Sequence, residues 1–306
     1  MNTAVALIFF NRPSTLRQVF DEIKKAQPPK LFLIQDGPRN EQDEIKIQEC
    51  RKIVSNIDWT CEVITDYAEE NLGCGVRPQS GITNAFKQVD KLIILEDDCV
   101  PDNSFFQYCE DLLNRYQNDE RISYISGLNH FEAWDFGGDS YGFTKTGAIW
   151  GWATWRRAWE KYDYAVSEIN NGYIKKQLRN NVKDAPKRIS VWEETNRRVA
   201  QGEKISYWDW QWGFVKYTQS QYVVVPKYNL ICNIGTGLES THAQKATSKH
   251  RKYKDYNHMP TKPIEFPLTH PKHMLCAEDY DERVLKTTRG NILKKMLKMV
   301  TRKFTH

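Results

Sequence analysis

The sequence predicts an α/β fold, in which a mainly parallel sheet is flanked by helices on both faces. Short apolar runs of strand length recur through the first 130 residues, and helical segments separate most of them. Continuous apolar runs are typical of strands that are buried on both faces. Alternation of strand and helix at this spacing predicts a parallel sheet. The expected strands cover residues 5–10, 31–34, 61–64, 92–95 and 122–126.

The helices expected between these strands are predicted from apolar residues that recur at helical spacing. Ser14 is placed to cap the first helix, whose apolar residues fall on one face. The glycine-containing loop 73–75 is expected to precede the third helix rather than to form part of it. The later helices of this half are expected over residues 41–57, 80–89 and 105–116.

Polar side chains follow three of these strands at the point where each strand ends. Asn11-Arg12 follows the first strand, Asp36 the second and Glu96-Asp97-Asp98 the fourth. Ligands of open α/β sheets bind beyond the carboxyl ends of the strands. We therefore expect these residues to converge on one crevice, although they lie far apart in the sequence.

Residues 140–235 have a different character. Eight of the ten tryptophans lie between positions 150 and 212, among short segments that predict helices over 154–161 and 209–219. Neither an internal repeat nor a low-complexity linker separates this region from the first. We expect one domain over residues 1–282, composed of an N-terminal half 1–130, a second half 131–242 and an irregular extension 243–282, followed by a tail 283–306.

The charge of the chain is concentrated in that tail. The net charge is +5, yet the tail carries eight Lys or Arg and no Asp or Glu, which leaves −3 for residues 1–282. A mildly acidic body argues against nucleic-acid binding, which needs a basic face or groove. The tail includes a possible basic amphipathic helix over 292–304, which is typical of a peripheral membrane anchor, although a helix packed on the body or a frayed end fits equally well.

Cysteine usage and hydropathy indicate the compartment. The seven cysteines are odd in number and include no Cys-x-x-Cys pair, which predicts reduced thiols in a cytosolic protein. The sequence has neither a secretory signal pattern nor an apolar run long enough to cross a membrane. We expect a cytoplasmic protein, with peripheral contact to the inner face of the membrane if the tail is an anchor.

Three consecutive acids directly after a buried strand predict a cation site. Adjacent carboxylates repel one another, whereas Mg²⁺ and Mn²⁺ prefer oxygen ligands and commonly bridge carboxylates to substrate phosphates. Such an ion would also neutralise a departing diphosphate. A solvated turn without a ligand remains the alternative for this triplet.

The motif resembles a known family. Residues 92–95 followed by Glu96-Asp97-Asp98 and Pro101-Asp102 resemble the acidic metal motif of GT-A-fold glycosyltransferases. The likeness is to the N-acetylglucosaminyltransferase I type and to a bacterial group of nucleotide-diphospho-sugar transferases, and it extends from about residue 4 to about residue 242. It implies a GT-A, Rossmann-like fold, a nucleotide-sugar donor bound by the N-terminal half, an acceptor bound by the second half, and Mn²⁺ or Mg²⁺ as cofactor.

The resemblance also implies roles for the donor-side residues. It makes Asp98 a metal ligand, places Asp97 and Glu96 against the donor ribose and sugar, and directs Arg12 to the diphosphate. A surface cation at a helix start is the alternative for Arg12.

Two further donor contacts follow from the resemblance. Gln35-Asp36 corresponds to a pair whose acid reads the uracil ring, and Arg77 lies where a basic or polar group packs near the base, in a segment that departs from the family pattern. Asp36 in Asp-Gly-Pro is alternatively a simple turn former.

The second centre is the segment 207–212, Tyr-Trp-Asp-Trp-Gln-Trp, which resembles the tryptophan-flanked acid that serves as catalytic base in this family. A general base must take the proton from the acceptor hydroxyl, and surrounding tryptophans would exclude water, the competing acceptor. The alternative makes Asp209 the cap of the following helix. Both assignments can hold together.

Other acceptor-side features are also matched by the resemblance. Trp150-Gly151 matches a segment that packs under the donor sugar, whereas Trp155 and Trp159 are expected in the core. His242 follows a glycine-containing segment and is a candidate to bind the metal or a phosphate, although a lone histidine is a weak signal.

The sequence thus predicts a metal-dependent, inverting glycosyltransferase that moves a sugar from a UDP-sugar, similar to UDP-GlcNAc, to a hydroxyl of a glycan or lipid-linked acceptor. A sugar nucleotidyltransferase is one alternative, but the first strand lacks the glycine-rich loop that cradles a triphosphate. A non-catalytic carbohydrate-binding relative is the other, and it would need neither Asp209 nor the acidic triplet.

Overall fold

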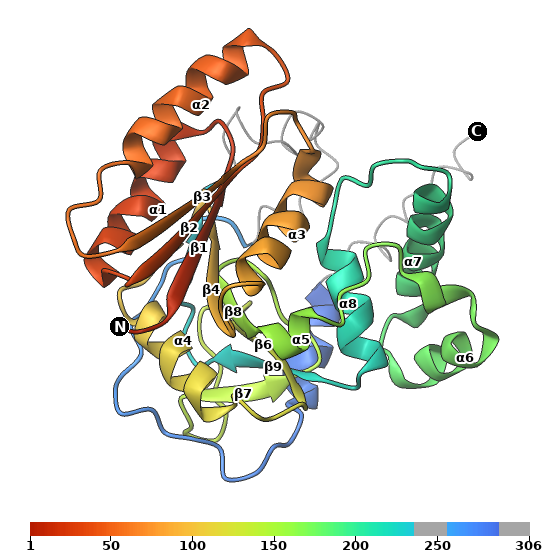
Figure 1. Cartoon of the computed structure of the whole chain (residues 1–306). Helices are drawn as coiled ribbons and strands as arrows, with labels where there is room; N and C mark the ends of the chain where they lie inside the picture. The colour runs from red at the N-terminus through yellow and green to blue at the C-terminus, as the bar shows by residue number, and fades with distance from the viewer. Residues whose placement is uncertain (236–255, 288–306) are drawn as a thin grey trace, which may run out of the picture.

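The computed structural model describes residues 1–235 and 256–287 (Figure 1). An eight-stranded sheet with the order β3-β2-β1-β4-β8-β6-β9-β7 runs through it, and β5 and β10 form a separate two-stranded sheet. The strands are β1 Ala4–Phe9, β2 Lys30–Gln35, β3 Glu62–Tyr67, β4 Lys91–Glu96, β5 Cys99–Pro101, β6 Ile122–Ser126, β7 Tyr141–Thr144, β8 Trp152–Trp155, β9 Tyr222–Pro226 and β10 Ile231–Asn233.

The sheet is mixed, and its parallel part holds the N-terminal strands. β1 pairs in parallel with β2 and β4, and β2 pairs in parallel with β3. β8 runs antiparallel between β4 and β6, and β7 runs antiparallel to β9. The predicted α/β fold with a mainly parallel sheet is confirmed.

Helices cover both faces of the sheet, as Figure 1 shows. Val5, Leu7 and Phe9 of β1 belong to a core shared with α1, α2 and α4, whereas the alternate residues of β1 belong to a second core shared with α3. Burial on both faces explains the continuous apolar run. The helices are α1 Pro13–Ala26, α2 Glu41–Val54, α3 Gly73–Phe86, α4 Ser104–Arg115, α5 Arg156–Trp159, α6 Gly172–Asn181, α7 Ala185–Ala200 and α8 Asp209–Thr218, with a 3-10 helix over Ser167–Asn170.

Several expected boundaries were wrong. Pro13 begins α1 with Arg12 at the N-cap, so Ser14 lies inside the first turn and does not cap it. The 73–75 segment belongs to α3, which starts at Gly73 instead of at position 80. Gly73 itself has φ 81°, a left-handed conformation that suits glycine. Residues 152–155 form a strand, so the expected helix over 154–161 is confined to α5.

A helical insert between α5 and α8 was not predicted from the sequence. This insert, residues 167–204, contains the 3-10 helix, α6, α7 and the turn that follows. It has its own small core, in which Ile169, Leu178, Ile189 and Trp192 pack with Phe214 of α8. The insert is therefore fixed to α8, the helix that begins with Asp209.

The described part of the C-terminal region is irregular except for a helix that starts at Glu278. The carboxylate of Asp281 accepts hydrogen bonds from the backbone N–H groups of Lys145 and Thr146, at 2.8 and 3.0 Å, and so fastens this helix to the end of β7. None of the described helices combines the length and apolar character needed to cross a membrane. The expected amphipathic tail helix over 292–304 lies outside the described residues.

The packing of α3 against residues 205–207 depends on the lack of a side chain at Gly75. A Cβ at this position would lie 1.8 Å from the carbonyl oxygen of Ile205 and 2.9 Å from the amide nitrogen of Tyr207, both backbone atoms. We expect Gly75→Ala to lower the free energy of unfolding by about 1–3 kcal/mol, the usual cost of overpacking. Gly172→Ala is the matched control, because a Cβ there meets nothing within 4 Å. Equal urea midpoints for the two variants would contradict this packing.

Candidate functional site

The carboxyl ends of β1, β2 and β4 bring the predicted polar residues to one edge of the sheet. Ile8 pairs with Ile34 on one side and with Glu96 on the other. Beyond the strands, the amide of Asp97 donates to the carbonyl of Ile8 at 3.0 Å, and the amide of Asp36 donates to the carbonyl of Phe9 at 3.3 Å. The expected convergence of the three strand ends is therefore present.

Arg12 is held between two of the acids. Its guanidinium donates to the carboxylate of Asp97 and, at 2.9 Å, to that of Asp98. The side chains are 15%, 3% and 13% exposed, so the pairs are nearly desolvated. The backbone N–H of Phe10 also donates to Asp97, at 3.2 Å. Burial disfavours the charged guanidinium, but the two carboxylates outweigh it and raise the pKa of Arg12.

The acids of the cluster outnumber their counter-ion. Residues 96–98 supply three carboxyl groups, and a single guanidinium pairs with two of them, Asp97 and Asp98. Burial, together with Asp98 and Asp97, raises the pKa of Glu96 to about 8. Burial also raises the pKa of Asp97, against the opposing effect of Arg12. Near neutral pH Glu96 is therefore mostly protonated in the protein alone, because burial and its two neighbouring acids disfavour a third negative charge.

The donor set at this edge suits a hard divalent cation. The Oδ1 atom of Asp98 meets only the thiol of Cys99, at 3.4 Å, within the described part of the chain. Carboxylate oxygens are the ligands that Mn²⁺ and Mg²⁺ prefer, and these ions usually keep several positions for water and phosphate. Among residues 1–235 and 256–287, no group of three or more His, Cys, Asp or Glu side chains is placed to hold a metal ion. Asp98 could supply one carboxylate oxygen, its Oδ1, to such an ion.

Asp36 is fully occupied by the protein. Its Oδ1 accepts from the amides of Gly37 and Leu72, at 2.9 and 2.8 Å, and its Oδ2 accepts from Asn71 and the amide of Gly73, at 3.1 and 2.8 Å. A carboxylate has about four acceptor positions. This favours the interpretation of Asp36 as a turn former that ties the start of α3 to β2, and a uracil ring would have to displace one of these donors.

Arg77 also has a structural role. Its buried guanidinium donates to the carbonyls of Gln35 and Asp66 and pairs with the Asp66 carboxylate at 2.7 Å. It thereby ties α3 to the ends of β2 and β3. One Nη1 donor contacts Ser80 at 3.4 Å, so one of the five N–H donors of Arg77 is left for the expected contact with a nucleotide base.

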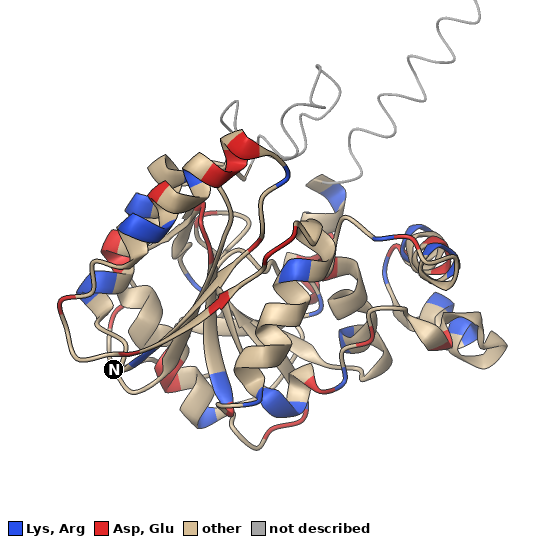
Figure 2. Ribbon diagram, turned by 45° about the horizontal axis from the view of Figure 1, so that its top comes forward, with Lys and Arg blue, Asp and Glu red and all other residues tan. Residues whose placement is uncertain are grey.

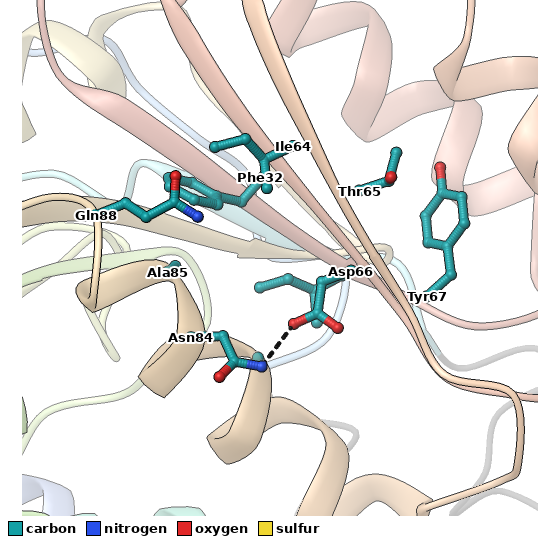
Figure 3. Close-up of a pocket in the computed structure, with 10 residues that line it drawn as sticks. Phe32, Ile64, Thr65, Asp66, Tyr67, Asn84, Ala85 and Gln88 are labelled. Atoms are coloured by element: carbon teal, nitrogen blue, oxygen red, sulfur yellow. Dashed lines mark hydrogen bonds between the residues drawn. The ribbon is translucent and has the colours of Figure 1, made fainter.

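A cavity of about 320 Å³ lies along the same helix but away from the acidic cluster. Figure 3 shows its lining from β2, β3 and α3, with Asn84 donating to Asp66 at 3.1 Å. None of the predicted site residues lines it. Its lining residues are Phe32, Ile34, Ile64, Thr65, Asp66, Tyr67, Gly81, Asn84, Ala85 and Gln88.

Trp150 and Gly151 pass over the end of β4. Gly151 has φ +59°, and a Cβ there would lie 2.2 Å from the Ile231 side chain and 3.3 Å from that of Leu95, the residue before Glu96. Its carbonyl accepts from the amide of Gly127 at 2.8 Å. Trp150 is half-buried against the same core. This segment is therefore next to the acidic cluster, as the resemblance implies.

Asp209 belongs to the same neighbourhood. It is the first residue of α8 and is exposed, and the preceding segment packs against the start of α3, where the Cys74 thiol donates to the carbonyl of Ser206 at 3.0 Å. Burial is the main cause that raises the pKa of Cys74, and the charges of Glu96, Asp36 and Asp209 add to it. The charge of Asp209 also contributes to the raised pKa of Glu96. Trp208 rather than Asp209 occupies the N-cap position.

Most of the tryptophans around Asp209 are core residues. Trp208 and Trp212 are buried and pack with Trp152, at ring-centroid distances of 5.7 and 6.1 Å. Because these two rings are buried, they present no face to a ligand, whereas Trp210 is partly exposed. Trp155 and Trp159 are buried, as expected.

His242 lies outside the described residues, so its role as a metal or phosphate ligand stays a prediction. Sequence reasoning missed two features of the site: the pairing of Arg12 with the acids, and the cations that α7 brings to Trp210. The first had a signal, since Arg12 and the triplet were both expected at the same sheet edge.

Comparisons with known proteins do not assign a family. No protein-family model and no curated protein matches the chain. The galactosyltransferase LgtC with donor and acceptor sugar analogues matches at 12% identity over 92% of this chain and 94% of that one, with a TM-score of 0.37. An LgtC active-site mutant matches with a TM-score of 0.40. A cytidylyltransferase from Leptospira borgpetersenii matches at 13% identity over 53% of this chain and 63% of that one, with a TM-score of 0.32. Such scores carry no functional assignment, and we infer function from the geometry.

Arg12 and Asp97 provide a double-mutant test of the cluster. Arg12→Met leaves buried carboxylates uncompensated, and we expect it to lower the free energy of unfolding by about 3–5 kcal/mol. Adding Asp97→Asn removes one of those charges, so the double variant should unfold at a higher urea concentration than Arg12→Met alone. If the two substitutions simply add in their effects, Arg12 is not the counter-ion of Asp97.

Proposed function

We propose that the chain is a metal-dependent glycosyltransferase that transfers a sugar from a nucleotide-diphospho-sugar to a hydroxyl acceptor. The observation that carries the proposal is the cluster of three acids at residues 96–98, which Arg12 alone serves as counter-ion, close to the exposed carboxylate of Asp209. A cation and a diphosphate together complete such a cluster, and a second carboxylate beyond it suits a general base.

The donor side is supported by Asp98 and Arg12. Asp98 is the residue that would hold Mn²⁺ or Mg²⁺, with Glu96 and Asp97 shaping the negative potential around it. When bound, the ion supplies charge neutralisation for the diphosphate leaving group. Arg12 holds Asp97 and Asp98 in place through two charge-assisted hydrogen bonds. It keeps the two carboxylates oriented toward the same edge of the sheet.

The acceptor side is supported by Asp209. Asp209 is the first residue of α8, where the helix dipole favours a negatively charged side chain. It would take the proton of the acceptor hydroxyl as that oxygen attacks the anomeric carbon. Direct attack from the face opposite the leaving group inverts the configuration. The buried tryptophans behind Asp209 limit access of water from the protein side.

UDP-sugars, with UDP-GlcNAc as the nearest example, are the donor class to test first. The choice rests on the resemblance at Gln35-Asp36, and the occupied carboxylate of Asp36 supports an indirect role for that residue, in shaping the turn 71–73. A nucleotidyltransferase is disfavoured because only residues 10–12 separate β1 from α1, and no glycine-rich loop lies between them. A glycan or a lipid-linked glycan is the acceptor class that the proposal takes.

Asp98→Asn tests the cation site. The substitution keeps the shape but removes a charged oxygen ligand, and we expect Mn²⁺-dependent affinity for UDP to fall by at least about 100-fold in titration calorimetry. Asp58→Asn is the matched control, since Asp58 is 65% exposed and lies in a surface pair with Lys24. UDP affinity that is unchanged in Asp98→Asn would remove this residue from the site.

Asp209→Asn tests the base. We expect UDP affinity to be retained and turnover of labelled UDP-sugar to fall by about 10²–10⁴-fold, the usual contribution of a general base. Turnover is measured as transfer to a panel of glycans and as donor hydrolysis. A variant that turns over at the wild-type rate would show that Asp209 takes no part in the chemistry.

A further inference from the structure

The helical insert has a charge opposite to that of the rest of the domain. Residues 167–204 contain nine Lys or Arg and five Asp or Glu, a net charge of +4. Residues 1–282 as a whole carry −3, so the other residues of that span sum to −7. Figure 2 shows Lys and Arg on both α6 and α7. A basic region on an acidic body attracts an anionic partner to that region.

Lys187 and Arg188 are two of the five cations of the insert that form no ion pair within residues 1–235 and 256–287. The other four cations of the insert pair with glutamates. The Nε atom of Arg188 is buried and has no hydrogen-bond partner in the same part of the chain. The Nε atom itself is out of reach of a ligand, so any hydrogen bond from Arg188 to a ligand would come from its terminal nitrogens. The paired cations are Lys175, Lys183, Arg197 and Arg198.

Lys187 and Arg188 flank an aromatic ring beside the proposed base. The Nζ atom of Lys187 lies 5.8 Å from the centroid of the Trp210 ring, and the Cζ atom of Arg188 lies 5.9 Å from it. Arg188 also lies 5.0 Å from the ring centroid of Tyr217, which is two turns further along the same face of α8. Trp210 is half-exposed and directly follows Asp209. The two cations are therefore next to the acceptor side of the site.

Packing fixes this arrangement. The indole N–H of Trp192 in α7 donates to the carbonyl of Trp210 at 2.8 Å, which ties α7 to the first turn of α8. An aromatic face suits the apolar face of a sugar ring, and a guanidinium matches the geometry of phosphate or carboxylate through paired N–H donors. One ligand that carries both features would engage Trp210, Lys187 and Arg188 together.

We propose that the acceptor is an anionic sugar, whose ring packs on Trp210 and whose phosphate or carboxylate group is bound by Lys187 and Arg188. The inference rests on the proposed function, because it takes Asp209 as the base next to that acceptor. A membrane surface fits less well, since Tyr173 is the single exposed large apolar side chain among the described residues of the insert. Surface helices that enter lipid present several such residues.

The experiment uses defined sugars in the absence of donor. Binding of glucose 6-phosphate, glucuronate and glucose to the full chain is followed by Trp fluorescence and by titration NMR. We expect the two anionic sugars to bind at least about fivefold more tightly than glucose, the effect of one charge-assisted hydrogen bond or more. Lys187→Gln/Arg188→Gln should abolish this preference. Lys176→Gln/Arg179→Gln removes the same charge from exposed positions of α6 and should retain it.

Three results would overturn the proposal: equal affinity of the anionic and neutral sugars, equal loss in both double variants, or binding of phosphatidylglycerol vesicles that both double variants weaken alike. Lys187→Gln alone, at an exposed position, must also reduce the preference, which covers the case in which the Arg188 variant fails to fold. UDP and Mn²⁺ binding is measured on the same samples. A wild type that prefers anionic sugars but binds no UDP contradicts the proposed function, whereas UDP binding without that preference contradicts this inference alone.

Discussion

The pairing of Arg12 with Asp97 and Asp98 is the constraint on which the site depends. Two adjacent carboxylates at a buried strand end repel one another, and removal of their counter-ion would leave charge in a poorly solvated place. Arg12 reaches them because β1 and β4 are direct neighbours in the sheet. The amide of Phe10 fixes Asp97 from the same strand end. Arg12 pairs with two of the three acids, and under the proposed function a divalent cation would complete the cluster.

Close backbone approaches connect this cluster to the rest of the site. A Cβ at Gly235 would lie 2.2 Å from Oδ2 of Asp98, and one at Gly151 would meet Leu95, directly before the acids. Gly75 allows α3 to lie against the segment that leads to Asp209. These glycines are needed for contact distance, and at Gly151 also for positive φ. Asp36 completes the frame by accepting three hydrogen bonds from Asn71, Leu72 and Gly73, where α3 begins.

The features that could be predicted from the sequence are those that depend on a local pattern of residues. A strand that is buried on both faces requires an apolar run such as 92–95. The order of strands and helices then implies that the polar residues after the strands meet at one edge of the sheet. The start of α3 was missed because Gly73 and Gly75 read as a loop, and the partners of Asp36 and Arg77 arise only from tertiary packing. The insert was missed because few of its side chains are buried, so α7 shows little more than Ile189 and Trp192 as an apolar face.

The most direct measurement of the central claim is the position of Mn²⁺ in crystals soaked with MnCl₂ and UDP, located by anomalous diffraction at the manganese edge. The account predicts one anomalous peak within bonding distance of an Asp98 carboxylate oxygen, about 2.1–2.3 Å, with the UDP diphosphate on its other side and Asp209 facing the same crevice. A crevice that holds no manganese, or a peak bound elsewhere in the chain with UDP present, would contradict it.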